Sequence, residues 1–176
     1  MAKLASTFMT EQQFWQIIEN SNKGENLTTE LHKLTEDEIF GYRYWWEYFC
    51  RQSYTQSLWA VAYTVMGGCG DDGFDYFRFW IVTRGETVYK NALANADSLC
   101  DTFDDCDYPE FEEADYAPWE VFEEKFGKNP YDAEADYDLG DKTLLEIKFE
   151  WHEDDEASIR KVCPKTFDKW WHNDKF

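Results

Sequence analysis

The stretch from residue 35 to residue 51, TEDEIFGYRYWWEYFCR, constrains the fold more than any other part of the sequence. Thr35 followed three residues later by Glu38 is a capping box, the signature of a helix start. The apolar residues after it recur at helical spacing and form one stripe: Ile39, Tyr42, Trp46 and Phe49. Further rings lie beside this stripe, so a helix from about Glu36 to Arg51 is apolar around much of its circumference. Such a helix is either central to the fold or presents its rings to a partner.

Helical patterns occur along most of the remaining chain. Thr10 with Gln13 is a second capping box, and it predicts a helix that ends near residue 20. Other helices are expected at LTTELHKL, at SLWAVAYTVM, at FDYFRFWIVTR with Asp71 or Asp72 as the cap, at ETVYKNAL, and from Pro118 and Pro164 as first helical residues. A chain of 176 residues with 43% hydrophobic residues is large enough for one core.

We therefore predict a mainly α-helical fold, in which residues 1–176 form a single irregular domain. Its helical core spans about 10–100, and an acidic irregular segment with short helical turns spans 101–140. A strand-like stretch and a C-terminal helix occupy 141–176. In the strand-like stretch, LLEIKFEWHEDD alternates apolar and polar residues. A short β-hairpin through Gly140 and Asp141 and an extended segment lying on the helical body both fit this pattern.

The chain is strongly acidic, with 17 basic and 37 acidic residues and a net charge of -20. Residues 101–138 contain 15 of the acids and only 2 of the bases. Such a field repels nucleic acids and anionic membranes, so neither is an expected partner, and it accelerates the approach of a basic protein. Acidity that only keeps an aromatic-rich protein soluble is the alternative. The candidate partner-binding residues are Asp104, Asp105, Asp107, Glu110, Glu112, Glu113 and Asp115.

A second candidate site lies in MGGCGDDGFDYFRFWIVTR, from residue 66 to residue 84. Two carboxylates and an arginine near a helix start are typical of a ligand site, but they are equally typical of a helix cap with an i, i+3 ion pair between Asp75 and Arg78. The candidate ligand or cleft residues are Asp71, Asp72, Asp75, Arg78, Trp59 and Trp80.

No catalytic or cofactor pattern in the sequence is specific enough to indicate a site. The glycines before Asp71 are followed by aspartates and no lysine, which excludes a phosphate-binding loop. His32, His152 and His172 are dispersed, and the five cysteines have no C-x-x-C spacing, so no zinc site is indicated. We expect no catalytic residue, metal or cofactor. Cys69 lies near a helix start, where a thiol pKa can be lowered, although a small buried cysteine is the stronger interpretation. The N-terminus has no signal-peptide pattern, and a reduced cytoplasmic protein is expected.

The residues LWAVAYTVMGGCGDDGFDYFRFWIVTR, with ADSL further on, resemble a bacterial protein family named domain of unknown function 4240. Its hallmark is a Leu-Trp-x-Ala segment, then Gly-Gly-Cys-Ser-Asp-Asp-Gly-Phe, then Phe-Arg-x-Trp. This chain departs from it with Gly70 in place of the usual serine. The resemblance implies a mainly helical fold and assigns no catalytic residue.

Together these patterns favour a protein without catalytic activity that binds a basic protein partner, with toxin neutralisation by an immunity protein as one form. The alternative is an enzyme or small-ligand binder at Asp71, Asp72, Asp75 and Arg78. A weaker alternative is a DNA mimic built from the acids between residues 101 and 156.

Overall fold

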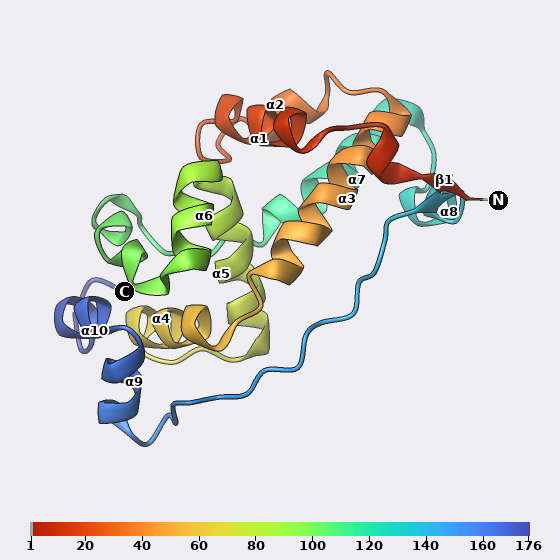
Figure 1. Ribbon diagram of the computed structural model, residues 1–176. Helices are drawn as coiled ribbons and strands as arrows, with labels where there is room; N and C mark the ends of the chain where they lie inside the picture. The colour runs from red at the N-terminus through yellow and green to blue at the C-terminus, as the bar shows by residue number, and fades with distance from the viewer. Residues whose placement is uncertain (1) are drawn as a thin grey trace.

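The computed structural model describes residues 2–176, and its central element is the aromatic helix α3 (Glu36–Gln52). Its start is the predicted capping box, in which Thr35 accepts from the Glu38 backbone N–H and the Glu38 side chain accepts from the Thr35 N–H. In Figure 1, α3 runs diagonally through the molecule, and it contacts α1, α5 and α7. The predicted stripe is buried along its whole length, at Ile39, Tyr42, Trp46 and Phe49. The structure thus places the helix centrally, the first of the two arrangements that its sequence permits.

The helices around α3 follow the predicted pattern closely. Their bounds are α1 (Glu11–Asn20), α2 (Leu27–Leu31), α4 (Gln56–Met66), α5 (Asp71–Thr83) and α6 (Glu86–Ala94). Thr10 forms the second capping box at the start of α1. Helix α4 ends at Gly67, whose φ of 68° is left-handed and favours glycine. The local sequence therefore determines where most of these helices begin and end.

Stacked and edge-packed rings form much of the core between α1, α3 and α6. The rings of Trp15, Phe49 and Tyr89 contact one another, and the Trp15 centroid lies 4.5 Å from that of Phe49 and 5.3 Å from that of Tyr89. The Tyr89 hydroxyl donates to the Phe49 carbonyl oxygen at 2.7 Å, so its polar end is satisfied inside the core. Each such ring pair adds about 0.5–1.5 kcal/mol beyond the burial of its apolar area. These contacts fix the relative positions of the three helices.

The C-terminal helices α9 (Glu156–Val162) and α10 (Pro164–Trp170) pack against α4, at the lower left of Figure 1. Pro164 is the first residue of α10, as predicted, whereas α9 was not expected from the sequence. The Asp97 carboxylate accepts from the backbone N–H groups of Lys165 and Thr166 at 2.9 and 2.8 Å. Asp97 belongs to the 3₁₀ helix η2 (Ala96–Asp105), so the chain end is joined to the middle of the sequence.

The acidic segment contains more helix than predicted. After η2, it forms α7 (Glu113–Phe126) and α8 (Pro130–Glu134). The predicted helix start at Pro118 is wrong, because α7 begins five residues earlier and Pro118 lies inside it. A proline inside a helix costs about 3 kcal/mol, but Pro118 and its neighbours Ala117 and Trp119 are buried in the core. Tertiary packing therefore overrides the usual position of proline.

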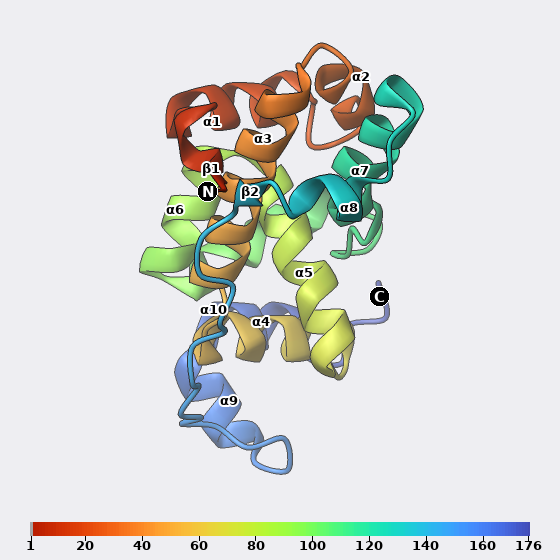
Figure 2. The same ribbon diagram turned by 90° about the vertical axis from the view of Figure 1, so that its right-hand side faces the viewer.

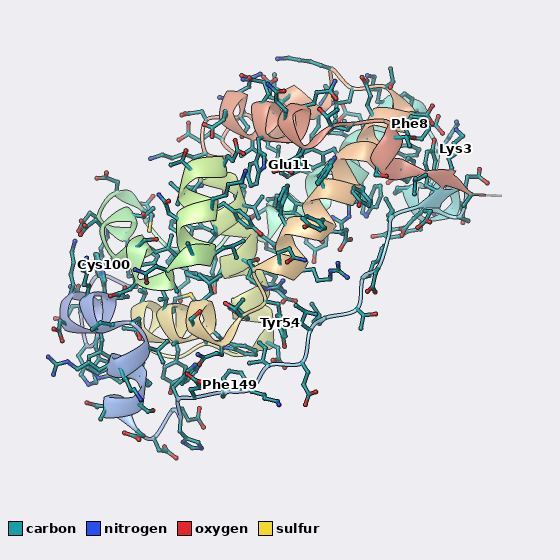
Figure 3. The ribbon with its side chains drawn as sticks, viewed as in Figure 1. Lys3, Phe8, Glu11, Tyr54, Cys100 and Phe149 are labelled. Carbon is teal, nitrogen blue, oxygen red and sulfur yellow. The ribbon has the colours of Figure 1, made fainter. Side chains whose placement is uncertain are left out.

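The two strands are short, and although they pair in space they are far apart in the sequence. β1 (Lys3–Leu4) pairs in parallel with β2 (Tyr137–Asp138), and Figure 3 shows Lys3 and Phe8 at this end of the molecule. Gly140 and Asp141 form no hairpin in the part of the chain described. Instead, residues 139–150 form the extended arrangement, and Figures 1 and 2 show them running along one side of the molecule from β2 toward α9. We call residues 139–150 the extended segment.

Hydrogen bonds and ring contacts attach the far end of the extended segment to α4. The Trp151 indole N–H, just beyond the segment, donates to the Gln56 carbonyl oxygen at 2.8 Å. The Phe149 ring packs edge-on against the Trp59 ring at a centroid distance of 5.4 Å. In Figure 3, Phe149 lies on this segment beside α4, and Tyr54 lies between α3 and α4. No helix among residues 2–176 is both long enough and apolar enough to cross a membrane.

Candidate functional site: a three-arginine cavity and an acidic face

Three arginines line one cavity of about 200 Å³ between α3, α5, α7 and the extended segment. Arg43, Glu47 and Arg51 are spaced four residues apart on α3, so they project from one face of that helix. Helix α5 contributes Asp75, Arg78 and Phe79, α7 contributes Asp115, and the extended segment contributes Lys142 and Leu144. We call this space the three-arginine cavity.

Arg43 is the most extensively bonded of the three arginines. Its guanidinium donates to the Asp115 carboxylate and to the Glu47 carboxylate, each at 2.6 Å, and to the Asp115 carbonyl oxygen at 2.9 Å. The side chain is almost fully buried. Burial favours the neutral form, but the charges of Glu47 and Asp115 outweigh it and raise the pKa of Arg43. Arg43 therefore stays charged inside the protein.

Arg78 connects α5, on which it lies, to α3. Its guanidinium donates to the Asp75 carboxylate, which confirms the predicted i, i+3 pair, and to the Cys50 carbonyl oxygen on α3. The same group lies 5.1 Å from the Tyr54 ring centroid and 5.4 Å from that of Phe74. Because cations are attracted to ring faces, these contacts hold Arg78 in place as well.

The other two cations of the cavity are paired near the surface. Arg51 lies 2.9 Å from the Asp141 carboxylate, whose side chain is 67% exposed. Lys142 lies 2.6 Å from the Glu134 carboxylate and is itself 44% exposed. Exposed ion pairs contribute little stability, so these two cations exchange partners more easily than Arg43 and Arg78.

The start of α5 departs from one sequence prediction. Gly70 is the residue that precedes the helix, while Asp71 and Asp72 occupy its first two positions and are exposed. Neither aspartate is therefore the cap, and both lie where the helix dipole favours a negative charge. Neither lines the three-arginine cavity. Of the acidic candidates in this motif, the cavity includes only Asp75.

The two candidate tryptophans lie away from the cavity. The Trp59 ring stacks on the Phe74 ring at a centroid distance of 4.5 Å, and its indole N–H donates to the Cys69 carbonyl oxygen. The Trp80 ring stacks on Phe103, and the Arg84 guanidinium lies 4.9 Å from its centroid. Trp80 and Arg84 line a separate groove with Asp105, Asp107 and Glu110 on its rim. The six candidate cleft residues therefore do not share one pocket.

The first turns of α5 lie against the acidic residues that precede α7. The Phe111 N–H donates to the Tyr76 carbonyl oxygen at 3.1 Å, and the Tyr76 hydroxyl donates to the Glu112 carboxylate at 2.9 Å. The Tyr116 hydroxyl donates to the same carboxylate at 3.2 Å. The tertiary fold thus brings members of both predicted candidate sets to one surface. We call this surface the acidic face, and it consists of Asp71, Asp72, Asp105, Asp107, Glu110, Glu112 and Glu113.

The shifted pKa values on this surface reflect burial together with its negative charge. Burial first and Glu112 second raise the pKa of Glu110. The hydrogen bond to Glu112 and then burial raise the pKa of Tyr76 to about 12. Burial, followed by the charges of Glu110, Asp71 and Asp75, raises the pKa of the Cys69 thiol to about 12. The thiol pKa is therefore shifted in the direction opposite to the one a helix start can produce.

Two candidate partner-binding acids have partners within the chain. Asp104 pairs with Lys169, and Asp115 pairs with Arg43 while also accepting from the Trp46 indole N–H at 2.8 Å. No ion pair within residues 2–176 involves any of the seven acids of the acidic face. Five of the seven partner-binding candidates, Asp105, Asp107, Glu110, Glu112 and Glu113, thus have no ion-pair partner within residues 2–176, although Glu112 accepts from two tyrosine hydroxyls.

Sequence reasoning did not single out Arg43, Glu47, Arg51 or Lys142. For Arg43, Glu47 and Arg51 the available signal was their spacing, because these charged residues recur every four positions in an otherwise aromatic helix. Lys142 lies in the extended segment and has no such signal. The chain also contains no group of three or more His, Cys, Asp or Glu side chains arranged to hold a metal, as far as residues 2–176 are concerned. The cavity is instead suited to binding polar groups by charge and hydrogen bonds.

Comparison with known proteins gives one match. A search of curated proteins and a search of solved structures each found nothing similar to the chain. The sequence model of a family described as protein of unknown function (DUF4240) matches residues 9–124. The match includes α1 to α6, η2 and most of α7, and therefore the helices that supply the arginines of the cavity. The chain belongs to the DUF4240 family.

Proposed function

We propose that this protein is a non-enzymatic, cytoplasmic bacterial binding protein of the immunity type, which recognises a basic protein partner through the acidic face. The observation that carries the proposal is the convergence of acids from α5 and from the chain around the start of α7, none of which forms an ion pair within residues 2–176, although Lys23 and Arg84 line the neighbouring groove. Elsewhere the same chain pairs its acids, for example Glu36 with Lys128 and Asp101 with Lys169.

Exposed aromatic rings on this surface support the proposal. Tyr108 and Tyr116 are 43% and 45% exposed. Tyr108 follows Asp107 in the sequence, and the Tyr116 hydroxyl donates to the Glu112 carboxylate. Tyrosine is enriched among the residues that contribute most to protein–protein affinity, because it offers a large apolar area and a hydroxyl group. Carboxylates around such rings steer a basic partner and fix its orientation. The acidic face thus combines contact area with charge complementarity.

The test is a comparison of two variants with equal net charge. A partner is first recovered by cross-linking in cells that express the protein, and its affinity is then measured by surface plasmon resonance. The face variant carries Asp71→Asn, Asp72→Asn, Asp105→Asn, Asp107→Asn and Glu113→Gln. The control variant changes exposed acids elsewhere and carries Glu120→Gln, Glu123→Gln, Asp132→Asn, Glu146→Gln and Glu150→Gln.

We expect the face variant to bind at least about tenfold more weakly, with most of the loss in the association rate, because steering depends on local charge. The control variant should remain within about threefold of the unchanged protein at physiological salt. Equal losses in both variants would show that only net charge matters, and an unchanged affinity in the face variant would place the interface elsewhere. Either result rejects the acidic face as the binding surface.

A further inference from the structure

Arginine is concentrated at the three-arginine cavity. The chain has only five arginines, and three of them line this single space, together with Lys142. The lining carboxylates number three, from Glu47, Asp75 and Asp115. The lining itself thus has one more cation than carboxylates, while Asp141 and Glu134 pair with Arg51 and Lys142 from outside the lining. In a protein with a net charge of -20, the overall composition does not predict such a gathering of cations.

The arginines also have more donors than the protein supplies with acceptors. The Nε–H groups of Arg43, Arg51 and Arg78 are buried, and none has a hydrogen-bond partner within residues 2–176. Buried donors are usually satisfied, because an unmade hydrogen bond is costly. The group that this cluster lacks is an acceptor, and a carboxylate supplies several acceptor sites with a negative charge.

The remaining walls of the cavity are apolar. Phe79 and Leu144 line it, and Cys50 adds a thiol whose pKa burial raises well above its usual value, so that it stays neutral. The volume of about 200 Å³ is smaller than the sites that hold drug-sized ligands. A ligand that fits is therefore compact and has a charged end and a short apolar body.

We propose that the three-arginine cavity binds a small organic carboxylate with a short aliphatic chain. Arg51 and Lys142 hold the carboxylate, because their present partners Asp141 and Glu134 lie toward the surface and exchange readily. Arg43 and Arg78 are themselves buried and paired with Asp115 and Asp75, and they provide the positive field behind it. Leu144 and Phe79 contact the aliphatic chain. This proposal does not depend on the acidic face or its partner.

Butanoate is a suitable probe, and butanamide is its neutral counterpart of nearly the same shape. Binding is measured by titration with two-dimensional amide NMR spectra, in which the Trp46 indole N–H is a natural reporter because it donates to Asp115 in the cavity wall. We expect saturable shifts at Trp46 and at the backbone of Cys50 and Phe79 with butanoate in the millimolar range or tighter. Butanamide, which lacks the charge, should cause no saturable shift.

Two substitutions near the surface test the assigned residues without disturbing the core. Arg51→Gln and Lys142→Gln should each weaken butanoate binding by about tenfold. The matched controls Arg160→Gln and Lys161→Gln remove exposed cations from α9 and should leave the affinity unchanged. Folding of each variant is checked from the dispersion of its spectrum.

Four results would overturn the proposal, three with the two probes and their variants and one with phosphate. The first is the absence of saturable shifts with butanoate, and the second is equal binding of butanamide. The third is butanoate binding that survives both Arg51→Gln and Lys142→Gln. Inorganic phosphate, titrated in parallel, distinguishes a carboxylate site from a general anion site. The fourth contradicting result is phosphate binding as tight as butanoate binding, because phosphate has no aliphatic chain for the apolar walls to contact.

Discussion

Arg43 and Asp115 lie 72 residues apart in the chain and form an ion pair of 2.6 Å that joins α3 to α7. Asp115 accepts from the Trp46 indole N–H as well, so one carboxylate satisfies a buried cation and a buried aromatic donor. This single side chain connects the aromatic helix to the acidic part of the sequence. It also explains why a residue that the sequence assigns to an external partner is needed inside the protein.

Replacing Asp115 by alanine should therefore destabilise the fold. We expect Asp115→Ala to lower the free energy of unfolding by about 2–3 kcal/mol, because Arg43 loses one of its two carboxylates in a nearly dry environment. Asp115→Asn should cost less, since its amide oxygen still accepts from Trp46. Urea denaturation measures both values. The control Asp101→Ala, at a 90% exposed side chain, should change stability by less than about 0.5 kcal/mol.

Gly41 in α3 and Gly70 before α5 should respond in opposite ways to an added side chain. A Cβ at Gly41 of α3 would lie 2.8 Å from the Met9 Cβ and 3.0 Å from the Met9 backbone nitrogen. Gly41→Ala should therefore lower stability by about 1–3 kcal/mol, despite alanine's better helix propensity. Gly70 has open space around it and precedes α5 with extended backbone angles. Gly70→Ser should raise stability by a few tenths of a kcal/mol by capping that helix, and thermal unfolding compares the two. A stabilised Gly41→Ala variant would contradict the close approach of the N-terminal segment to α3.

The Asp37 carboxylate should make stability depend on pH in the acid range. It accepts from the Lys3 ammonium at 2.8 Å and from the Tyr137 hydroxyl at 2.5 Å, and these bonds, with Lys3 the larger cause, lower its pKa. A carboxylate with a lowered pKa in the folded state stabilises the fold above its unfolded pKa of about 3.9 and loses that contribution as the pH falls through the folded value. Asp37→Asn should therefore destabilise the protein at pH 7 more than at pH 2.

Urea denaturation at a series of pH values checks this prediction. Asp136→Asn is a suitable control, because Asp136 is exposed and lies beside the same strand pair. A loss of stability in Asp37→Asn that is equally large at pH 7 and at pH 2 would show that the ion pair with Lys3 contributes nothing.

Cys69 should react slowly with thiol reagents, although it is more exposed than the other four cysteines. Burial first, and then Glu110, Asp71 and Asp75, raise its pKa to about 12. At pH 8 its alkylation by iodoacetamide should be at least about a hundredfold slower than that of an unstructured thiol with a pKa near 8.5. Mass spectrometry of the Cys69 peptide measures the rate.

A double change tests whether the acids contribute to this slow reaction. The variant with Asp71→Asn and Glu110→Gln should react faster, whereas Glu120→Gln on the exposed side of α7 should not. Rapid alkylation of Cys69 in the unchanged protein would contradict the raised pKa. An unchanged rate in the double variant would assign the slow reaction to burial alone.

Much of the fold could be predicted from the sequence because its signals are local. The capping boxes at Thr10 and Thr35 determine where α1 and α3 begin, since the bonds that satisfy a helix terminus involve residues three positions apart. The prediction failed at α7, because Pro118 has a strong local preference that burial of the surrounding residues overrides. It also left open whether residues 139–150 pair with another strand, since pairing depends on a partner elsewhere in the chain.

The candidate site could be predicted only in part, for the same reason. The i, i+3 pair of Asp75 and Arg78 was visible, but its neighbours in the cavity come from α3, α7 and the extended segment. The sequence by itself determined most of the helices around α3, the acidic charge and the match to the DUF4240 family. The helix signals among these depend on residues close together in the chain. Only the tertiary structure decided that three arginines share one cavity, that Asp115 faces inward and that Asp71 lies beside the acids before α7. Long-range ion pairs and buried rings set those positions, and no local pattern encodes them.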